Sequence, residues 1–290
     1  MENNSGAPLL GLVHDLPNSE YHRGPGLSNS GLKWLSKSPW HYHALNHLPR
    51  PEWMAADDDD EDTATTLFAG TLCHCATLEP FEFDKRYVVG PAINKNTKDW
   101  KEFVKANAPR QVITARQHAV AHAQAAVLKS VPAVAEILDG GECELSGYWI
   151  DQATGVLCRC RPDCANRTFG TPEAPAAMLL DLKTTGDASK FAVRNTIAKF
   201  GYHRQAEWYT RGFAQAARMP VAGFIFAFIE QKYPFGCSVF ELDPEAYEVA
   251  RRENRELLEL YAHCERMGEW PGYSQDIEYV SLPRWAGGVE

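Results

Sequence analysis

The sequence lacks any apolar run long enough to cross a bilayer. Its first residues, Met1 to Val13, also lack the basic-then-apolar pattern of a secretion signal. We therefore expect a cytoplasmic protein that is not bound to a membrane. Cysteine is too sparse for a disulfide scaffold, with eight in 290 residues, so we expect free thiols.

An excess of positive charge is also missing, because the formal net charge is −9. Such a balance argues against nucleic-acid binding, but only weakly. The run from Asp57 to Asp62 alone supplies six of the acids. One stretch, residues 190–211, is basic, with Glu207 its only acid. Its cations are Lys190, Arg194, Lys199, Arg204 and Arg211. The stretch is either a solvated face or a surface that follows phosphates.

Several signatures of other chemistries are absent. There is no phosphate-binding loop of the Walker type, which argues against an ATP-driven motor. The patterns G-x-S-x-G, H-E-x-x-H and G-x-G-x-x-G do not occur either. The closely spaced Cys158, Cys160 and Cys164 match no zinc-binding pattern, so buried or free thiols are the simpler interpretation.

The alternation of helical and strand-like segments predicts an α/β fold. We interpret residues 1–27 as an irregular N-terminal arm and residues 28–290 as one domain, with a flexible loop at 49–62. Helices are expected within 28–38, 63–78, 97–138, 187–217 and 244–267. Strands are expected at 143–151, 156–161, 176–183, 221–229 and 236–242. The result is a central mixed β-sheet flanked by helices, with a helical elaboration at the N-terminus.

An acid and a lysine share one face at the end of the predicted strand 176–183. Asp181 and Lys183 are two positions apart, so they project together while Leu182 points into the core. Asp163 follows another strand and can lie opposite them. Two converging carboxylates form a hard-oxygen site suited to Mg²⁺. The lysine can then position or deprotonate an attacking water and offset charge on phosphorus.

Taken singly, these features have ordinary explanations. An Asp-x-Lys pair is usually a surface ion pair, and a histidine such as His74 is usually a core or surface residue. Gln205 and Tyr209, at positions i and i+4 of a predicted helix, share one face but are also common helix residues. Their order in the chain is what is specific: Gly-x-x-x-His at 70–74, then Asp163, Asp-x-Lys at 181–183, and Gln-x-x-x-Tyr at 205–209.

This order resembles the PD-(D/E)XK nuclease superfamily, in the branch that includes RecB-type nuclease domains. The resemblance extends over nearly the whole chain to the nuclease domain of the RecE-type exonucleases (exonuclease VIII). The segments that carry it are residues 27–32 (LSNSGL), 38–42 (SPWHY), 70–74 (GTLCH), 160–163 (CRPD), 181–185 (DLKTT) and 282–286 (LPRWA).

The resemblance implies a role for each of these residues. The metal ligands would be His74, Asp163, Asp181 and the backbone carbonyl of Leu182, with Mg²⁺, or Mn²⁺ in its place, as the cofactor. Lys183 would be the catalytic lysine, and Gln205 and Tyr209 would orient Lys183 or the DNA phosphates. The family implies 5′→3′ digestion of linear double-stranded DNA, leaving 3′ single-stranded tails for a single-strand annealing protein. It also implies a homotetrameric ring.

Two departures from the family pattern leave these residues untouched: the acidic run at 57–62 and the lack of a very long N-terminal extension. Some relatives hold an iron–sulfur cluster, but no cysteine triplet follows Tyr209 here. Two alternatives stay open. One is an endonuclease or single-strand nuclease of the same fold, and the other is a non-catalytic DNA-binding or phage-assembly protein. The intact Asp163, Asp181 and Lys183 argue against the second.

Overall fold

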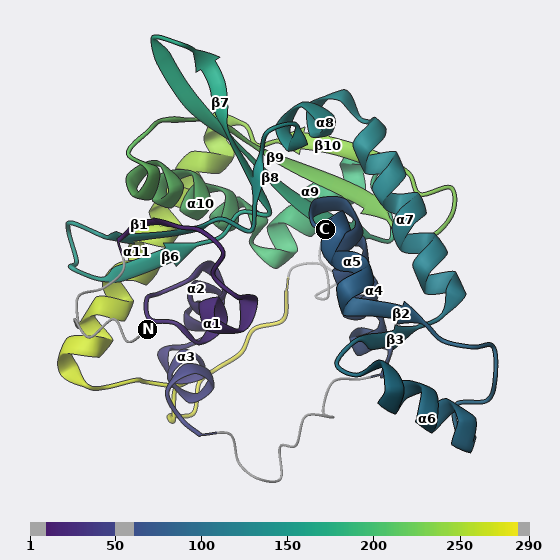
Figure 1. The fold of residues 1–290 in the computed structure, drawn as a ribbon. Helices are drawn as coiled ribbons and strands as arrows, with labels where there is room; N and C mark the ends of the chain where they lie inside the picture. The colour runs from purple at the N-terminus through teal and green to yellow at the C-terminus, as the bar shows by residue number, and fades with distance from the viewer. Residues whose placement is uncertain (1–9, 50–60, 284–290) are drawn as a thin grey trace, which may run out of the picture.

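A computed structural model describes residues 10–49 and 61–283, and of the first helical turn at 61–64 it describes the backbone only (Figure 1). The strands are β1 (Gly11–Val13), β2 (Tyr87–Val89), β3 (Gln111–Ile113), β4 (Glu142–Cys143), β5 (Ser146–Ile150), β6 (Leu157–Cys160), β7 (Cys164–Thr171), β8 (Ala174–Thr185), β9 (Val221–Glu230) and β10 (Cys237–Glu241). The helices are α1 (Asn18–Arg23), α2 (Asn29–Leu35), α3 (Pro39–Asn46), α4 (Glu61–Leu78), α5 (Pro80–Arg86), α6 (Lys98–Asn107), α7 (Ala115–Ser130), α8 (Pro132–Leu138), α9 (Lys190–Phe200), α10 (Tyr202–Ala217) and α11 (Pro244–Met267).

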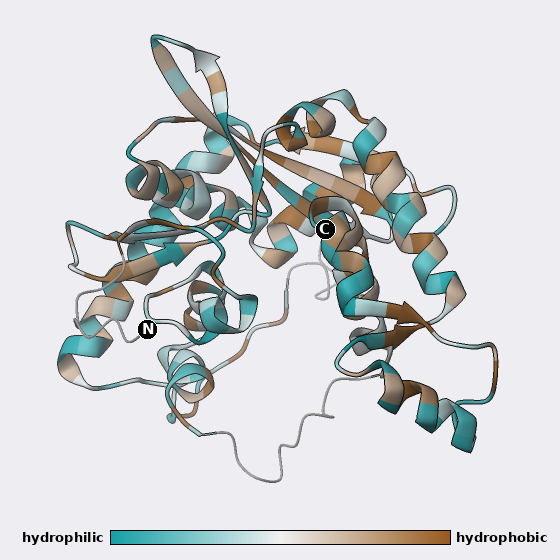
Figure 2. Ribbon diagram, in the orientation of Figure 1, coloured by the Kyte–Doolittle hydropathy of each residue, from teal (hydrophilic) through white to brown (hydrophobic). Residues whose placement is uncertain are grey.

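The central sheet has the order β10-β9-β8-β7-β4. Strands β8 and β9 run parallel, and the other neighbours are antiparallel. The predicted mixed sheet is therefore confirmed. Strands β8 and β9 are strongly hydrophobic because helices cover both of their faces (Figure 2).

Alternate residues of β8 belong to different cores. Leu180 and Leu182 pack on the side of α7 and α8, with Leu128 and Val134. Leu179 faces the other way, into a cluster with Trp208 of α10. By the two-residue period of a strand, Asp181 and Lys183 share the face of Leu179. The pleat of β8 thus turns the acid and the lysine toward α9 and α10.

The N-terminal arm is not irregular throughout, which corrects the expectation for residues 1–27. Residues 11–13 form β1, which pairs with β5 in a second sheet of order β1-β5-β6, and residues 18–23 form α1. Arg159 of β6 donates to the carbonyl of Tyr21 at 2.5 Å, and Arg161 donates to the carbonyl of Leu16 at 2.9 Å. Because these contacts come from distant positions, the arm shows no periodicity of its own. Residues 1–9 lie outside the described part.

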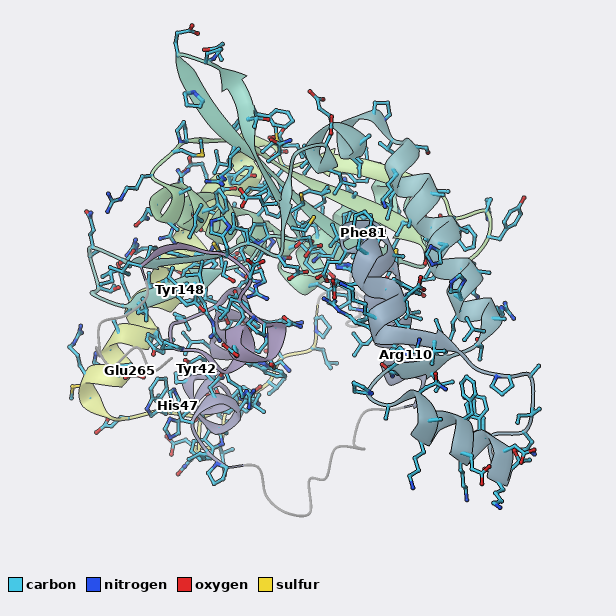
Figure 3. All side chains as sticks on the ribbon, viewed as in Figure 1. Tyr42, His47, Phe81, Arg110, Tyr148 and Glu265 are labelled. Atoms are coloured by element: carbon cyan, nitrogen blue, oxygen red, sulfur yellow. The ribbon has the colours of Figure 1, made fainter. Side chains whose placement is uncertain are left out.

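Helix α2 forms as predicted, whereas helix α3 was not expected. Ser28 caps α2 by accepting from the backbone N–H of Gly31 at 3.2 Å. Tyr42 of α3 stacks on Trp270 just beyond α11, with ring centroids 5.5 Å apart, and Figure 3 places Tyr42 and His47 near the end of α11 that carries Glu265. Most of the loop expected at 49–62 lies outside the described residues, and α4 begins at Glu61.

Besides β1, three strands were not predicted from the sequence: β2, β3 and β7. Strands β2 and β3 are three residues long and pair in parallel beside α6, within and next to a stretch expected to be helical. Strand β7 is longer, but its outer half is polar and partly exposed, so it lacks alternation. It pairs with β8 as a hairpin that projects beyond the sheet (Figure 1). No helix in the described part of the chain is long and apolar enough to span a membrane.

Candidate active site

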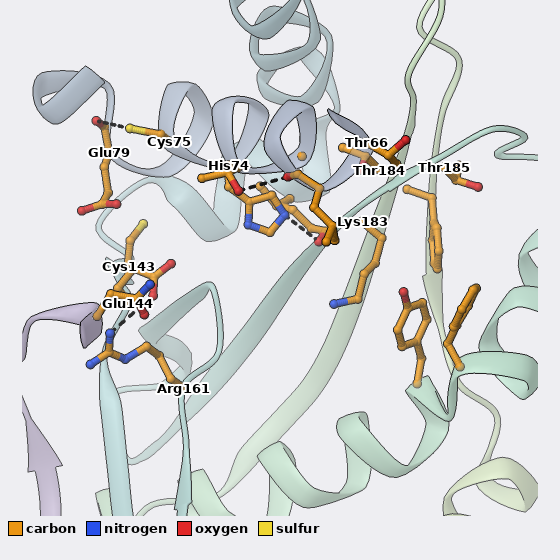
Figure 4. Close-up of a pocket in the computed structure, with 18 of the residues that line it drawn as sticks. Thr66, His74, Cys75, Glu79, Cys143, Glu144, Arg161, Lys183, Thr184 and Thr185 are labelled. Atoms are coloured by element: carbon orange, nitrogen blue, oxygen red, sulfur yellow. Dashed lines mark hydrogen bonds and ion pairs between the residues drawn. The ribbon is translucent and has the colours of Figure 1, made fainter. Parts of the chain in front are cut away.

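A cleft of about 1310 Å³ opens over the end of β8. One wall comes from the arm and α2, including Asp15 and Lys33, and the opposite wall comes from α4 and α5. The floor is the end of β8, and Phe200 and Tyr202 close one side. Figure 4 shows His74 of α4 and Lys183 of β8 facing this space. The cleft therefore gathers residues that are more than 100 positions apart.

Asp181 is fixed from two sides. Its side chain is 1% exposed, and Oδ1 accepts a hydrogen bond of 2.7 Å from the amide nitrogen of Gln205. Oδ2 forms an ion pair with Lys183 Nζ. No hydrogen bond of normal geometry reaches Oδ2 from the described residues, and the atom is buried. Asp181 thus keeps one buried oxygen incompletely satisfied, which is costly unless another group binds there.

Asp163 and His74 meet at the next residue of β8. Asp163 Oδ2 accepts a hydrogen bond of 2.6 Å from the backbone N–H of Leu182. His74 Nε2 lies 2.9 Å from the carbonyl oxygen of the same residue, and Nδ1 lies 3.5 Å from Asp163 Oδ2. The register explains this meeting, because Cys164 pairs with Leu180 and so brings Asp163 alongside Asp181.

The electrostatics of the pair on β8 favour a charged lysine. Burial raises the pKa of Asp181, and the Asp163 carboxylate raises it further, while the Lys183 ammonium opposes both. Burial alone would lower the pKa of Lys183, but Asp181 and Asp163 outweigh it and the pKa is raised. Lys183 therefore suits positioning a water and stabilising negative charge better than removing a proton.

The donor set fits a divalent cation with a preference for oxygen. The groups are two carboxylates, one imidazole and the Leu182 carbonyl, which match Mg²⁺ or Mn²⁺. His74 Nε2 and the Leu182 oxygen are within hydrogen-bond distance of each other, at 2.9 Å, so two of these donor atoms lie side by side. Within the described ranges, no three His, Cys, Asp or Glu side chains are grouped as a metal site as they stand. The fit rests on the donor chemistry and on the buried Asp181 Oδ2, which accepts no hydrogen bond of normal geometry and is paired with Lys183 Nζ.

Gln205 is connected to Lys183 through Asp181. Its amide contacts Asp181 Oδ1, and Asp181 Oδ2 pairs with Lys183. Tyr209, one turn further along α10, lies deep beside Gln205, and burial raises its pKa well above the ordinary value. Its ring packs on Phe224, with centroids 6.1 Å apart. The two residues therefore support a carboxylate from below the cleft.

Two further residues, Glu144 and Tyr202, line the site although no sequence pattern pointed to them. Glu144 follows β4 with a φ of 55°, a left-handed conformation uncommon outside glycine. Burial, followed by the Asp163 charge, raises the pKa of Glu144 to about 7, although Arg161 lies 3.8 Å away. Tyr202 places its ring 4.8 Å from Lys183 Nζ. Only the fold brings these positions to the cleft.

The basic stretch 190–211 divides between two places. Arg204 forms an ion pair with Glu253 of α11, and Arg211 forms ion pairs with Glu207 of its own helix and with Asp151. Carboxylates therefore neutralise both arginines. Lys190, Arg194 and Lys199 lie on α9 and are exposed. The cations of the α9 half thus lie on a solvent-exposed face, and α9 also borders the cleft through Thr196 and Phe200.

A solved structure shares this architecture. A protein from Eubacterium rectale, described as a candidate exonuclease, superposes with a TM-score of 0.56 at 12% identity, covering 98% of this chain and 100% of that one. At that identity the likeness shows the fold alone. The structure of SSO0001 aligns with a TM-score of 0.29 at 15% identity, covering 66% of this chain and 74% of the other, too weakly to support an argument. No curated protein matches the sequence.

The sequence itself matches a family described as a PDDEXK-like domain of unknown function (DUF3799), over residues 28–283. The match includes every residue that we placed in the cleft from α2 onward. It supports the superfamily resemblance, though not the RecE-type branch in particular. With its mixed sheet, its Asp-x-Lys strand end and this match over most of its length, the chain belongs to the family of PDDEXK-like domains.

Proposed function

We propose that this protein is a divalent-metal-dependent deoxyribonuclease that degrades linear double-stranded DNA from the 5′ end. One observation carries the proposal. Asp181 is buried between Gln205 and Lys183. Asp163 and His74 both contact the backbone of Leu182, which lies between Asp181 and Lys183 on β8. Such a buried acid is expensive in a purely structural role, and its position at the floor of a large cleft suits the handling of a phosphodiester.

Each residue of the site has a separate role in this proposal. His74, Asp163, Asp181 and the Leu182 carbonyl would hold Mg²⁺ or Mn²⁺, which when bound supplies Lewis-acid polarisation of a phosphoryl oxygen. Lys183, charged and held by Asp181, orients the attacking water and offsets negative charge that develops on the phosphate. Gln205 fixes the Asp181 carboxylate through Oδ1, and Tyr209 supports Gln205. Hydrolysis breaks the P–O bond and leaves a phosphate on one product and a hydroxyl on the other.

The exonuclease assignment rests on two supports. The ordered motifs resemble the RecE-type exonucleases, and the Eubacterium rectale protein of similar fold is described as a candidate exonuclease. On this proposal the products are 3′ single-stranded tails, which suit a single-strand annealing protein as partner in recombination.

We further propose a homotetrameric ring. The chain is acidic overall, with a net charge of −9, while α9 presents lysines and an arginine beside the cleft. Closing several copies around a channel would concentrate these few cations on DNA, and the acidic exterior would disfavour other binding modes. A closed ring must also be threaded by an end, which would limit the enzyme to linear substrates.

The test compares linear duplex DNA with closed circular plasmid. Linear duplex labelled at its 5′ or 3′ end should shorten with early loss of the 5′ label, and the circle should stay intact. Asp181→Asn should abolish cleavage. Asp187→Asn is the matched control, because it removes an exposed carboxylate yet keeps the oxygen that accepts from the Ser189 N–H. Nicking of the circle at an equal rate would favour the endonuclease alternative, and no cleavage at all would favour a non-catalytic DNA-binding protein.

A further inference from the structure

Two aromatic rings at the side of the cleft are stacked on each other. Phe200 ends α9 and Tyr202 begins α10, and their centroids are 5.8 Å apart at an interplanar angle of 28°. The residue between them, Gly201, has a φ of 71°, a conformation that favours glycine. A Cβ at this position would lie 2.6 Å from Arg204 Nη2. Gly201 therefore lets the chain turn so that both rings lie on the same side.

The two rings differ in their surroundings. Tyr202 is anchored on Phe226 and Phe228, with centroids 5.9 and 6.3 Å away. Phe200 is 43% exposed and lines the cleft. An exposed large ring on an otherwise rigid support loses little conformational freedom when a ligand packs on it. This arrangement is typical of residues that bind a ligand by stacking.

Cations surround this stack. Lys33 Nζ lies 5.8 Å and Lys199 Nζ 5.3 Å from the centre of the Phe200 ring. On the inner side, Lys183 Nζ lies 4.8 Å from the centre of the Tyr202 ring. Neither Lys33 nor Lys199 forms an ion pair with a carboxylate of the described residues. A single aromatic side chain thus separates the exposed Phe200 ring from the lysine at the candidate active site.

We propose that Phe200 is the stacking platform for the base of a terminal or unpaired nucleotide, with Lys33 and Lys199 on the adjoining phosphates. The inference rests on the proposed deoxyribonuclease function and assigns a substrate subsite to it. Inside a duplex both faces of every base are covered by its neighbours, so an aromatic side chain can stack only on a terminal or unpaired base. Stacking is tolerant of base identity, because every base has a π-face. The subsite would therefore recognise strand ends rather than sequences.

The experiment measures binding apart from cleavage. The Asp181→Asn protein is titrated with Mg²⁺ present into a short duplex that carries the fluorescent base 2-aminopurine at its 5′ end. Stacking on Phe200 should quench the fluorescence. Phe200→Leu keeps the apolar bulk without a π-face and should abolish the quenching and weaken binding roughly tenfold, within the range of base–aromatic stacking. Phe200→Trp should retain both.

The matched control is Phe191→Ala at the other end of α9, since Phe191 is also aromatic, is 71% exposed and lies outside the cleft. It should change neither quenching nor affinity. A Phe200→Leu protein that quenches and binds like its parent would overturn the subsite while leaving the proposed function intact. If no variant binds DNA, the proposed function fails and the subsite fails with it. Circular dichroism confirms that each variant is folded.

Discussion

The amide nitrogen of Gln205 donates a hydrogen bond of 2.7 Å to Oδ1 of Asp181, linking α10 to the centre of the sheet. The bond leaves Oδ2 directed at Lys183 and constrains the carboxylate to one orientation. A single amide thus determines where the acid presents its remaining lone pairs. At metal sites, replacing a residue that orients a metal-ligating side chain typically lowers metal affinity or activity by about 10- to 100-fold.

Gln205→Ala should lower activity about 10- to 100-fold, as loss of a supporting partner does at metal sites. The expected change is mainly a higher Mg²⁺ concentration for half-maximal rate, because Asp181 is no longer held. Steady-state rates across a Mg²⁺ titration measure this. Gln215→Ala, an exposed glutamine on the same helix, is the control. Equal Mg²⁺ requirements for the two variants would contradict the supporting role.

Lys183→Ala should reduce the single-turnover cleavage rate by about 10²–10⁴-fold, while DNA affinity changes little because one cation among several is lost. Lys183→Arg should recover little activity, since a planar guanidinium does not replace a compact ammonium. Single-turnover kinetics and equilibrium binding separate the two quantities. Lys101→Ala on α6, exposed and outside the lining of the cleft, is the matched control. If Lys183→Ala cleaved DNA at the normal rate but bound it weakly, Lys183 would be a residue that only contacts a phosphate.

Activity should require Mg²⁺ or Mn²⁺, stop in excess chelator and fail in Ca²⁺, which binds with looser geometry. His74→Ala should increase the metal concentration needed, because the imidazole beside the Leu182 carbonyl is removed. His263→Ala, exposed on α11, should behave like the parent protein. Isothermal titration with Mn²⁺ gives a readout independent of turnover. Full activity in chelator would refute the metal site.

The ionisation of Asp151 should make the free energy of unfolding depend on pH. Burial alone would raise its pKa, but hydrogen bonds from Arg255 and Thr154 outweigh burial and lower the pKa to about 2, from an ordinary value of 3.8. The folded pKa lies below the unfolded one, so the stabilisation is complete above about pH 4 and is lost as the pH falls toward 2. Asp151→Asn should cost about 1–3 kcal/mol at pH 7.

Urea unfolding of the parent and Asp151→Asn proteins at a series of pH values tests this. The difference between their free energies of unfolding should shrink as the pH falls from about 4. Asp276→Asn, exposed beyond α11, provides the control. A difference that stays constant down to pH 2 would show that Asp151 is not ionised against Arg255 in the folded state.

In solution the protein should be a homotetramer. Light scattering at several concentrations measures the mass, and degradation of linear duplex with the 5′ strand lost first should accompany that assembly. A monomer that degrades linear DNA processively would refute the ring and leave the chemistry of the cleft untouched.

Helices, strands and turns that are determined by a local sequence pattern could be predicted. The apolar run before Asp181 predicted β8, and the i, i+2 spacing predicted that Asp181 and Lys183 share a face. The long helix α11 and the hairpin turn at 152–155 follow from equally local signals. In each case the deciding interactions lie within a few residues of one another.

Features that depend on distant partners could not be predicted. Strand β1 forms because it pairs with β5, and the first pair of the register, Gly11 with Tyr148, is 137 positions apart in the sequence. The role of Gln205 depends on how α10 crosses the sheet, which no spacing reveals. Glu144 lines the cleft because its backbone is left-handed, with a φ of 55°, and a glutamate gives no sequence signal for that conformation. The nearness of Asp163, Asp181 and Lys183 could thus be predicted from the sequence, but the contact of Gln205 with Asp181 could not.

Because side chains alternate along β8, the residues of the candidate active site and the residues that pack against α7 and α8 are different residues of the same strand. Substitutions at Asp181 or Lys183 leave the packing of Leu180 and Leu182 against α7 and α8 in place, so a descendant could shed catalysis in one step and still fold. Conversely, a shift of one residue in the β8–β9 pairing would carry both side chains into the opposite core at once. For protein engineering, β8 is therefore tolerant of a change in chemistry and intolerant of an insertion.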